Sequence, residues 1–125
     1  IFWVIIVMYY LLYIKFKIKG EIMDSQLKRG ILTICILQLL TTKDAYGYDI
    51  IKFLQNYFYD TEESTFYAIL RRLNKDGLTD IYYIESPHGP KRKYYKITNT
   101  GKEKLNNYLS SWHEIERIFS DIGIL

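Results

Sequence analysis

The spacing of hydrophobic residues changes twice along this chain, and these changes limit the folds it can adopt. Between Gln26 and Lys75, apolar residues recur every three or four positions, as they do on helices. From Leu78 to Thr98, two runs rich in Ile and Tyr flank the turn residues Ser86 to Pro90, which predicts a β-hairpin. From Gly101 to Ile122 the helical spacing returns. The pattern predicts one mainly α domain of the α+β class, with a single hairpin between helices.

Two helices are predicted in the first part of the periodic region. The first, Gln26 to Leu40, follows the capping pair Asp24-Ser25, and its apolar residues are dense enough that we expect it to be covered on most sides. The second, Tyr46 to Phe58, follows Asp44, which can cap it. Gly47 near its start disfavours a helix, so we expect another backbone to approach closely there.

The third predicted helix follows Ser64, a favourable cap, and ends at Gly77 in the position of a C′ glycine. One side is apolar and carries Phe66, Ile69, Leu70 and Leu73. The other side carries Ser64, Tyr67, Ala68, Arg71, Arg72 and Lys75. Two helices joined by a short turn, the second exposing hydroxyl and Arg groups, suit a helix-turn-helix that reads DNA. A helical hairpin with a solvated polar face is the alternative.

Positive charge is concentrated around the hairpin. The whole chain has 17 Lys and Arg against 14 Asp and Glu. Residues 71–104 alone hold nine basic side chains against four acidic ones, a patch that attracts phosphates. The cluster Lys91-Arg92-Lys93 lies beside the turn, where a wing can touch the backbone or minor groove of a duplex. Tyr94 and Tyr95 point to opposite faces, so at least one should pack inward.

The last predicted helix, Gly101 to Ile122, carries apolar residues at alternating spacings of three and four, which is a heptad seam. The seam consists of Leu105, Tyr108, Trp112, Ile115, Phe119 and Ile122. Because fewer than three heptads are too short for a free coiled coil, we expect this helix to pack against the first helix of a second subunit and against its own mate. Trp112 is interpreted either as an interface anchor or as a wall of a ligand cavity.

Residues 1–22 open with 14 uncharged and almost wholly apolar residues, after which Lys and apolar residues alternate. The run is shorter than the ~20 apolar residues of a spanning helix and lacks the charge order of a secretory signal. Met23 stands just before the cap of the first periodic helix. We therefore expect the functional domain to begin at Met23 and residues 1–22 to be an upstream extension. A membrane anchor is the alternative, and a membrane partner is not expected.

Four segments, in this order and at this spacing, resemble the PadR family of winged helix-turn-helix transcriptional regulators. They are YGYDI (Tyr46 to Ile50), STFYAILRRLNKDGL (Ser64 to Leu78), GPKRKYYKIT (Gly89 to Thr98) and the following TNTGKEKL. The resemblance covers about Leu27 to Phe119, while residues 1–22 depart from it because family members start near Met23. It implies a winged helix-turn-helix domain over residues 23–100 with a two-stranded β-wing, and a C-terminal dimerisation helix over residues 101–125. It further implies a homodimer on a palindromic operator, usually acting as a repressor.

Candidate site residues follow from the pattern and the resemblance together. Those expected to contact double-stranded DNA are Tyr46, Tyr48, Ser64, Thr65, Tyr67, Arg71, Arg72, Lys91, Arg92 and Lys93. Trp112, Ile115 and Glu116 are expected at an effector site or dimer interface. Similarity to multidrug-sensing members implies that a planar cationic molecule stacks between paired tryptophans, with Glu116 balancing its charge. Without such a ligand, Glu116 is a solvated carboxylate.

Catalysis is not expected, and neither is a metal or cofactor. His88 in the predicted turn and His113 on the last helix have no nucleophile or carboxylate pair placed beside them. Cys35 cannot form an intramolecular disulfide and suits a small core residue in a reducing compartment, which favours the cytoplasm. Two alternatives to a DNA-binding regulator stay open: a winged-helix protein-interaction module, and a membrane-tethered regulator that uses residues 1–22.

Overall fold

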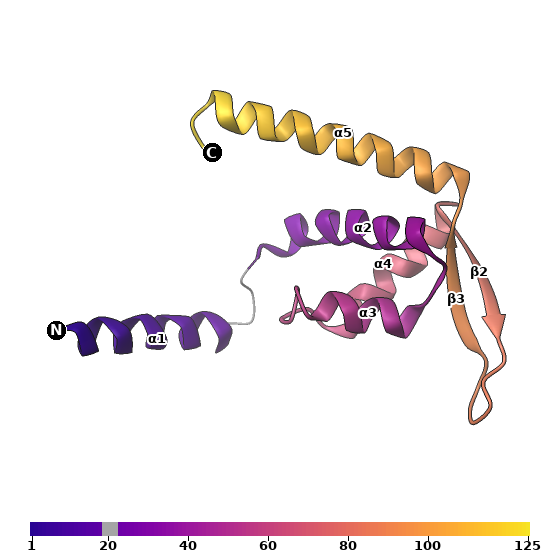
Figure 1. Cartoon of the computed structure of the whole chain (residues 1–125), viewed down its shortest axis with the longest axis horizontal. Helices are drawn as coiled ribbons and strands as arrows, with labels where there is room; N and C mark the ends of the chain where they lie inside the picture. Colours follow the sequence, from indigo (N-terminus) through magenta and orange to yellow (C-terminus); the bar gives the residue numbers. More distant parts are fainter. Residues whose placement is uncertain (19–22) are drawn as a thin grey trace.

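The computed structural model describes residues 1–18 and 23–125, which form helices and one small antiparallel sheet (Figure 1). The fold is mainly helical with a wing between the last two helices, as predicted. In chain order the elements are α1 (Phe2–Ile18), α2 (Ser25–Thr42), β1 (Ala45–Tyr46), α3 (Gly47–Gln55), α4 (Glu63–Lys75), β2 (Thr79–Ile84), β3 (Arg92–Ile97) and α5 (Asn99–Asp121).

Helix α2 forms the centre of the domain. Its start is the predicted one, because the Asp24 carboxylate accepts hydrogen bonds from the backbone N–H groups of Gln26 and Leu27 at 3.1 and 3.2 Å. Its buried residues are Lys28, Leu32, Ile36, Leu37 and Leu40. Leu27 near its start is 56% exposed. None of the residues from Ile31 to Leu37 is exposed, so the middle of the helix is covered on most sides, as expected.

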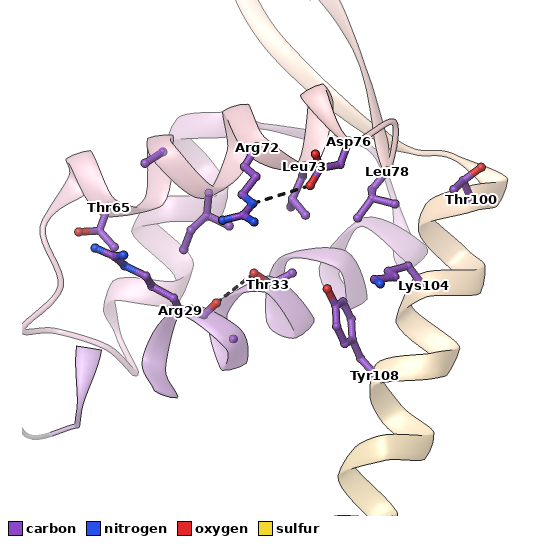
Figure 2. A pocket seen from close by; sticks show the side chains of 13 residues that line it. Arg29, Thr33, Thr65, Arg72, Leu73, Asp76, Leu78, Thr100, Lys104 and Tyr108 are labelled. Carbon is purple, nitrogen blue, oxygen red and sulfur yellow. Dashed lines mark hydrogen bonds and ion pairs between the residues drawn. The ribbon is translucent and has the colours of Figure 1, made fainter. Parts of the chain in front are cut away.

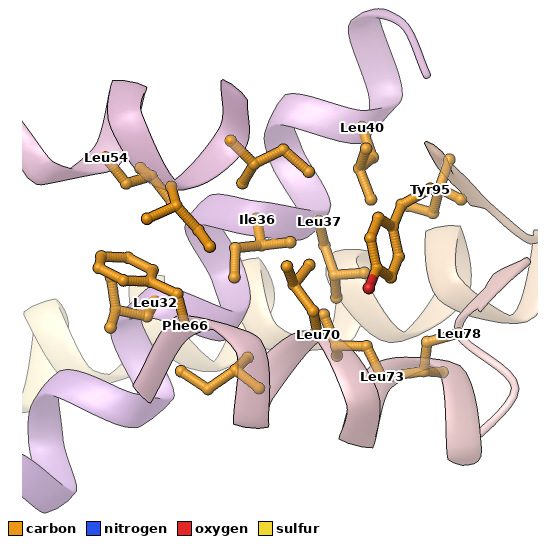
Figure 3. Close-up of a cluster of buried hydrophobic side chains, with 14 of the residues drawn as sticks. Leu32, Ile36, Leu37, Leu40, Leu54, Phe66, Leu70, Leu73, Leu78 and Tyr95 are labelled. Carbon is orange, nitrogen blue, oxygen red and sulfur yellow. The ribbon is translucent and has the colours of Figure 1, made fainter. Parts of the chain in front are cut away.

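The hydrophobic core lies where α2, α3 and α4 meet the sheet (Figure 3). Helix α4 enters it through the predicted stripe, because Phe66, Ile69, Leu70 and Leu73 are all buried. Tyr95 on β3 is also buried and points into the core, whereas its neighbour Tyr94 is only half-buried. The prediction that one of these two tyrosines packs inward is confirmed.

The sheet has the strand order β1-β3-β2, and both pairs are antiparallel. The two-stranded wing is present as predicted, but it is extended by a third strand that sequence reasoning missed. In this strand, Ala45 pairs with Tyr95 and Tyr46 with Tyr94. A strand of two residues is too short to show the alternation of apolar and polar residues by which strands are recognised.

The caps predicted for the second and third helices are wrong. Helix α3 has Tyr46 as its N-cap and ends at Gln55, and Asp44 instead accepts a hydrogen bond from the Tyr82 hydroxyl at 2.7 Å. Because residues 45–46 extend to pair with β3, Asp44 lies at the sheet and away from the helix start. Helix α4 has Glu62 as its N-cap, which places Ser64 inside the first turn.

Two glycines allow close packing around the core. Beside Gly47, an added Cβ would lie 3.0 Å from the Tyr95 ring, so the close approach expected there comes from a side chain and not from a backbone. The backbone approach occurs at Gly101 in the first turn of α5, where a Cβ would collide with the Leu78 carbonyl oxygen. Gly77 has a φ of +76° and follows α4 as the predicted C′ glycine.

Helix α5 begins close to the predicted position and runs alongside α2 (Figure 1). The Thr98 hydroxyl accepts from the Gly101 N–H at 2.9 Å and donates to the Gly77 carbonyl at 2.7 Å, which joins the start of α5 to the end of α4. The first half of the predicted seam packs inward, with Leu105 buried and Tyr108 half-buried. In the second half, Trp112, Ile115 and Ile122 are exposed, whereas Phe119 is half-buried.

Residues 2–18 form a helix, α1, that sequence reasoning did not predict. The side chains of residues 1–13 are exposed, and Tyr13 is hydrogen-bonded to Tyr59, which follows α3. Within the described ranges, residues 1–18 and 23–125, no helix is both long and apolar enough to cross a membrane.

We expect Gly101→Ala to destabilise the domain by about 1–3 kcal/mol, because the new methyl group has no space beside the Leu78 carbonyl. Gly89→Ala is the matched control, since a Cβ there meets nothing within 4 Å, and it should change the free energy of unfolding by less than about 0.5 kcal/mol. Urea unfolding followed by circular dichroism measures both. Equal stability of the two variants would contradict the close contact at Gly101.

Candidate nucleic-acid interface

The polar side of α4 consists of two stripes that face different surroundings. Ser64, Tyr67 and Arg71 follow one another at helical spacing and form the outward stripe. Ser64 and Arg71 are exposed, whereas Tyr67 packs partly against the core. Arg71 is exposed and makes no ion pair with any residue that the structure describes. Tyr67 is half-buried, and burial is the main cause that raises the pKa of its phenol. An exposed guanidinium one helical turn from a phenol hydroxyl is an arrangement suited to a base edge or a phosphate.

The second stripe of α4 faces α2 and α5 instead. Thr65 and Arg72 belong to it, and they line a cavity of about 790 Å³ between these three helices (Figure 2). The Arg72 guanidinium lies 3.8 Å from the Asp76 carboxylate, and 83% of its side chain is exposed. Sequence reasoning placed both arginines on the polar side, with Arg72 nearer its rim, and in the structure Arg72 lines the cavity whereas Arg71 does not.

Two ion pairs hold the turn that joins α3 to α4. The Lys52 Nζ lies 2.9 Å from Glu63 Oε1, and this hydrogen bond raises the pKa of Lys52. Both groups are about half exposed, so the pair adds little stability. The Lys28 Nζ and an Asp60 carboxylate oxygen are 3.6 Å apart and both side chains are nearly buried, so removal of one partner is expected to be costly. They connect the first turn of α2 to the turn before α4 and so define how α4 is presented.

A row of four tyrosines crosses the outer face of the sheet. Ring centroids are 6.0 Å apart for Tyr48 and Tyr46, 6.0 Å for Tyr46 and Tyr94, and 5.6 Å for Tyr94 and Tyr82. The bond to Asp44 is the main cause that raises the pKa of Tyr82. Sequence reasoning selected Tyr46 and Tyr48 but not the other two. Tyr82 lies opposite Tyr94 across the hairpin, and this cross-strand pair of aromatic residues is the sequence signal that could have identified both.

The basic cluster of the wing is divided between the two faces of the hairpin. The Arg92 guanidinium lies 5.0 Å from the centre of the Tyr46 ring and so joins the tyrosine row. Lys93 lies 5.8 Å from the Tyr95 ring, on the other face of the strand. Lys91 is beside the turn, and its Nζ is 3.4 Å from Glu85. Arg92 is therefore the member of the cluster that the fold holds on the outer face.

The residues predicted for an effector site or interface lie on the distal half of α5. Trp112 is 37% and Ile115 is 36% exposed, and they are three positions apart on one face of the helix. Glu116 follows Trp112 by one turn, with a carboxylate oxygen 3.9 Å from His113 Nδ1. The three side chains are thus brought together on one exposed surface, away from α4 and the wing.

A sequence profile of the transcriptional regulator PadR-like family matches residues 36–107, which include α3, α4, the whole sheet and the start of α5. The match spans more than half of the chain and contains both the helix pair and the wing. The chain belongs to the PadR-like family. Members of this family are DNA-binding transcription factors and not enzymes, so the predicted winged helix-turn-helix regulator is confirmed.

Two solved structures described below agree with this PadR-like assignment, and one further relative is similar in sequence. An uncharacterized protein of Lysinibacillus sphaericus is 38% identical over 97 residues, which cover 75% of this chain and 89% of that protein. The structure of a PadR-like transcription factor from Bacteroides fragilis is 39% identical, with a TM-score of 0.69, and covers 78% of this chain and 95% of the other. A PadR-like transcriptional regulator from Bacillus cereus has 33% identity, a TM-score of 0.68 and coverages of 78% and 96%.

Proposed function

We propose that this PadR-like protein is a cytoplasmic repressor that binds a palindromic operator as a homodimer and is released by a small molecule. The observation that carries the proposal is the outward stripe of α4 beside the wing, with Arg71 exposed and Arg92 held on the tyrosine row. Helix α4 would enter the major groove, and the wing would contact the adjacent backbone or minor groove.

The proposed division of labour follows the elements. Residues 23–100 would bind DNA and residues 101–125 would dimerise, while residues 1–22 would take no part in either. The exposed seam of α5 supports dimerisation, because Trp112 and Ile115 leave apolar surface in water. Exposed Leu27 on α2 supports the expectation that the partner's α5 packs near the start of that helix. A two-fold axis between such subunits would match a palindromic operator.

An operator is first selected from random duplexes or from the region upstream of the protein's own gene. We expect Arg71→Ala to weaken binding to this operator by ~1–3 kcal/mol if Arg71 reads guanine. Arg71→Lys tests the reading mode, because lysine keeps a phosphate contact but loses the bidentate fork. If Arg71 reads a base, the lysine variant should lose discrimination at one operator position. Fluorescence anisotropy with single-base operator variants measures this loss.

Replacement of Lys91, Arg92 and Lys93 by Ala should act differently. It should weaken operator and unrelated DNA about equally and flatten the salt dependence, because phosphate contacts release counterions without reading sequence. Titrations at several salt concentrations give the slope. If the Arg71 variants and the wing variant all bind the operator as tightly as the parent does, the winged helix-turn-helix is excluded as the DNA reader. Parent affinity for DNA that does not vary with salt would favour a protein-interaction module.

We expect sedimentation at micromolar concentration to report twice the 15.0 kDa mass of the chain. Ile115→Glu should shift the protein toward a monomer, because it would place a charge in the proposed seam. Glu114→Gln changes charge on the same helix but not on the seam and serves as the control. A stable, soluble monomer of the parent chain would contradict the proposed assembly.

Trp112 is our candidate for an effector site at the dimer axis, where a planar cationic molecule would stack and Glu116 would balance its charge. The chain has two tryptophans, so Trp3→Phe leaves Trp112 as the only source of tryptophan fluorescence. A planar cationic dye should quench this variant and weaken its operator binding. A tenfold release requires ~1.4 kcal/mol of preference for the released state. Trp112→Ala, which keeps Trp3, is the control. If the dye quenches this control as strongly, or quenches Trp112 without changing operator binding, Trp112 is only an interface anchor.

A further inference from the structure

One side-chain hydrogen bond on the outer face of the sheet joins the outer strand of the wing to the start of the sheet. The Tyr82 hydroxyl on β2 donates to the Asp44 carboxylate, which immediately precedes β1, at 2.7 Å. Because β1 and β2 each pair with β3, which lies between them, the side chain of Tyr82 must cross the middle strand to reach this acceptor. The bond therefore links the segment that leads into α3 to the far side of the wing.

Tyr94 on the middle strand stacks against the ring of Tyr82 on one side and against that of Tyr46 on the other. In the register of the sheet, Tyr94 is opposite both of them, so the three residues form one line across the strands. The planes of Tyr82 and Tyr94 are inclined by 19°, and those of Tyr46 and Tyr94 by 30°. Stacked aromatic pairs attract each other beyond the effect of burial. The side chain of Tyr82 is thus held at its ring by stacking and at its hydroxyl by Asp44.

The tyrosine row also orients Arg92. This residue is two positions before Tyr94 on β3, a spacing that places both side chains on one face of the strand. Among the side chains that the structure describes, Arg92 has no carboxylate partner, and its guanidinium lies 5.0 Å from the centre of the Tyr46 ring. A guanidinium held on an aromatic face keeps its N–H groups available for phosphate oxygens. The direction of Arg92 therefore depends on the position of the Tyr46 ring.

The same ring lies close to the outward stripe of α4. Burial is the main cause that raises the pKa of Tyr67, and the neighbouring Glu63, Tyr46 and Tyr95 raise this pKa further. Tyr46 is thus within electrostatic reach of α4 as well as in contact with Arg92. A change in the tyrosine row would change where Arg92 lies relative to α4.

The bond between Tyr82 and Asp44 suits the control of direction more than that of stability. It is the main cause that raises the pKa of Tyr82, so the phenol stays protonated and remains a donor at neutral pH. Tyr82 is 37% exposed, so water can replace the lost partner and the bond adds little to the free energy of unfolding. A phenylalanine in its place would keep the stacked ring and lose only the link across the sheet.

We propose that Tyr82 is a positioning residue for DNA binding, because its bond to Asp44 fixes the tyrosine row and the row aligns Arg92 beside α4. The wing then meets the duplex with Arg92 already in place, and less conformational entropy is lost on binding. The contact of Arg92 with DNA rests on the proposed function. The alignment of Arg92 does not, since it is a property of the free protein.

The first experiment measures this alignment without DNA, by proton NMR of the full chain. The ring current of Tyr46 should shift the side-chain signals of Arg92 upfield from their random-coil positions. Tyr82→Phe removes the donor and Asp44→Ala removes the acceptor, so each should move these signals toward random coil, and the double variant should move them no further. Tyr83→Phe makes the same change on the other face of β2 and should leave the signals where the parent has them.

Two outcomes of the NMR comparison would overturn the alignment. One is that the Arg92 signals are unchanged in both Tyr82→Phe and Asp44→Ala. The other is an equal movement in Tyr83→Phe, which would indicate a general loosening of the wing. If Tyr82→Phe does not fold, as judged by circular dichroism, Asp44→Ala decides the test alone, because its change lies outside the strands.

The second experiment tests whether the alignment acts on DNA, through a double-mutant cycle measured by fluorescence anisotropy with a selected operator. Tyr82→Phe should weaken binding several-fold in the parent. In the Arg92→Ala background it should weaken binding by less than about twofold, because a positioning residue has no effect without the group that it positions. Tyr83→Phe should bind the operator like the parent.

Equal losses from Tyr82→Phe in the two backgrounds would overturn the positioning role, because Tyr82 would then act on DNA or on the fold independently of Arg92. Operator binding by Tyr82→Phe that equals that of the parent would overturn it as well. If the parent binds no operator under any condition, the proposed function fails, and the NMR comparison still decides whether Tyr82 aligns Arg92.

Discussion

The packing of α4 against α2 determines how every other surface of this protein is presented. Phe66 and Leu70 are fully buried, and they meet Leu32, Ile36 and Leu37 in one continuous core (Figure 3). Because a helix with four buried positions on one side cannot rotate without exposing them, the directions of its polar residues are set by this contact. The nearly buried Lys28–Asp60 pair acts at the same junction, and it resists changes in the turn that precedes α4.

The wing is attached to this core through β3. Tyr95 inserts its ring beside Gly47, while on the opposite face Tyr94 stacks between Tyr46 and Tyr82. One strand therefore contacts the core with one face and carries the tyrosine row on the other, as the alternation of strand side chains requires. Since the row begins at the start of α3 and ends on β2, the helix pair and the wing are connected as one unit.

Much of this arrangement could be predicted from sequence, because the spacing of hydrophobic residues in a long segment indicates its secondary structure. The four helices after Met23, the hairpin and the buried stripe of α4 follow from local spacing alone. What could not be predicted depends on neighbours distant in sequence. Strand β1 exists only because β3 lies beside it, and its pairing removes Asp44 from the expected cap. Likewise, the polar side of α4 is divided by α2 and α5, whose positions no local pattern contains.

This division places two adjacent arginines in different surroundings. Consecutive residues on a helix point about 100° apart, and with the apolar stripe of α4 packed against the core this rotation places Arg72, but not Arg71, in the lining of the cavity. Arg71 is on the outward stripe, and Arg72 is at the border between that surface and the cavity. A residue at such a border can respond to either side, whereas one at the centre of a surface responds to that surface alone. We therefore expect Arg71 to reach a base edge or a phosphate in the groove, and Arg72, nearer the rim, to contact the DNA backbone.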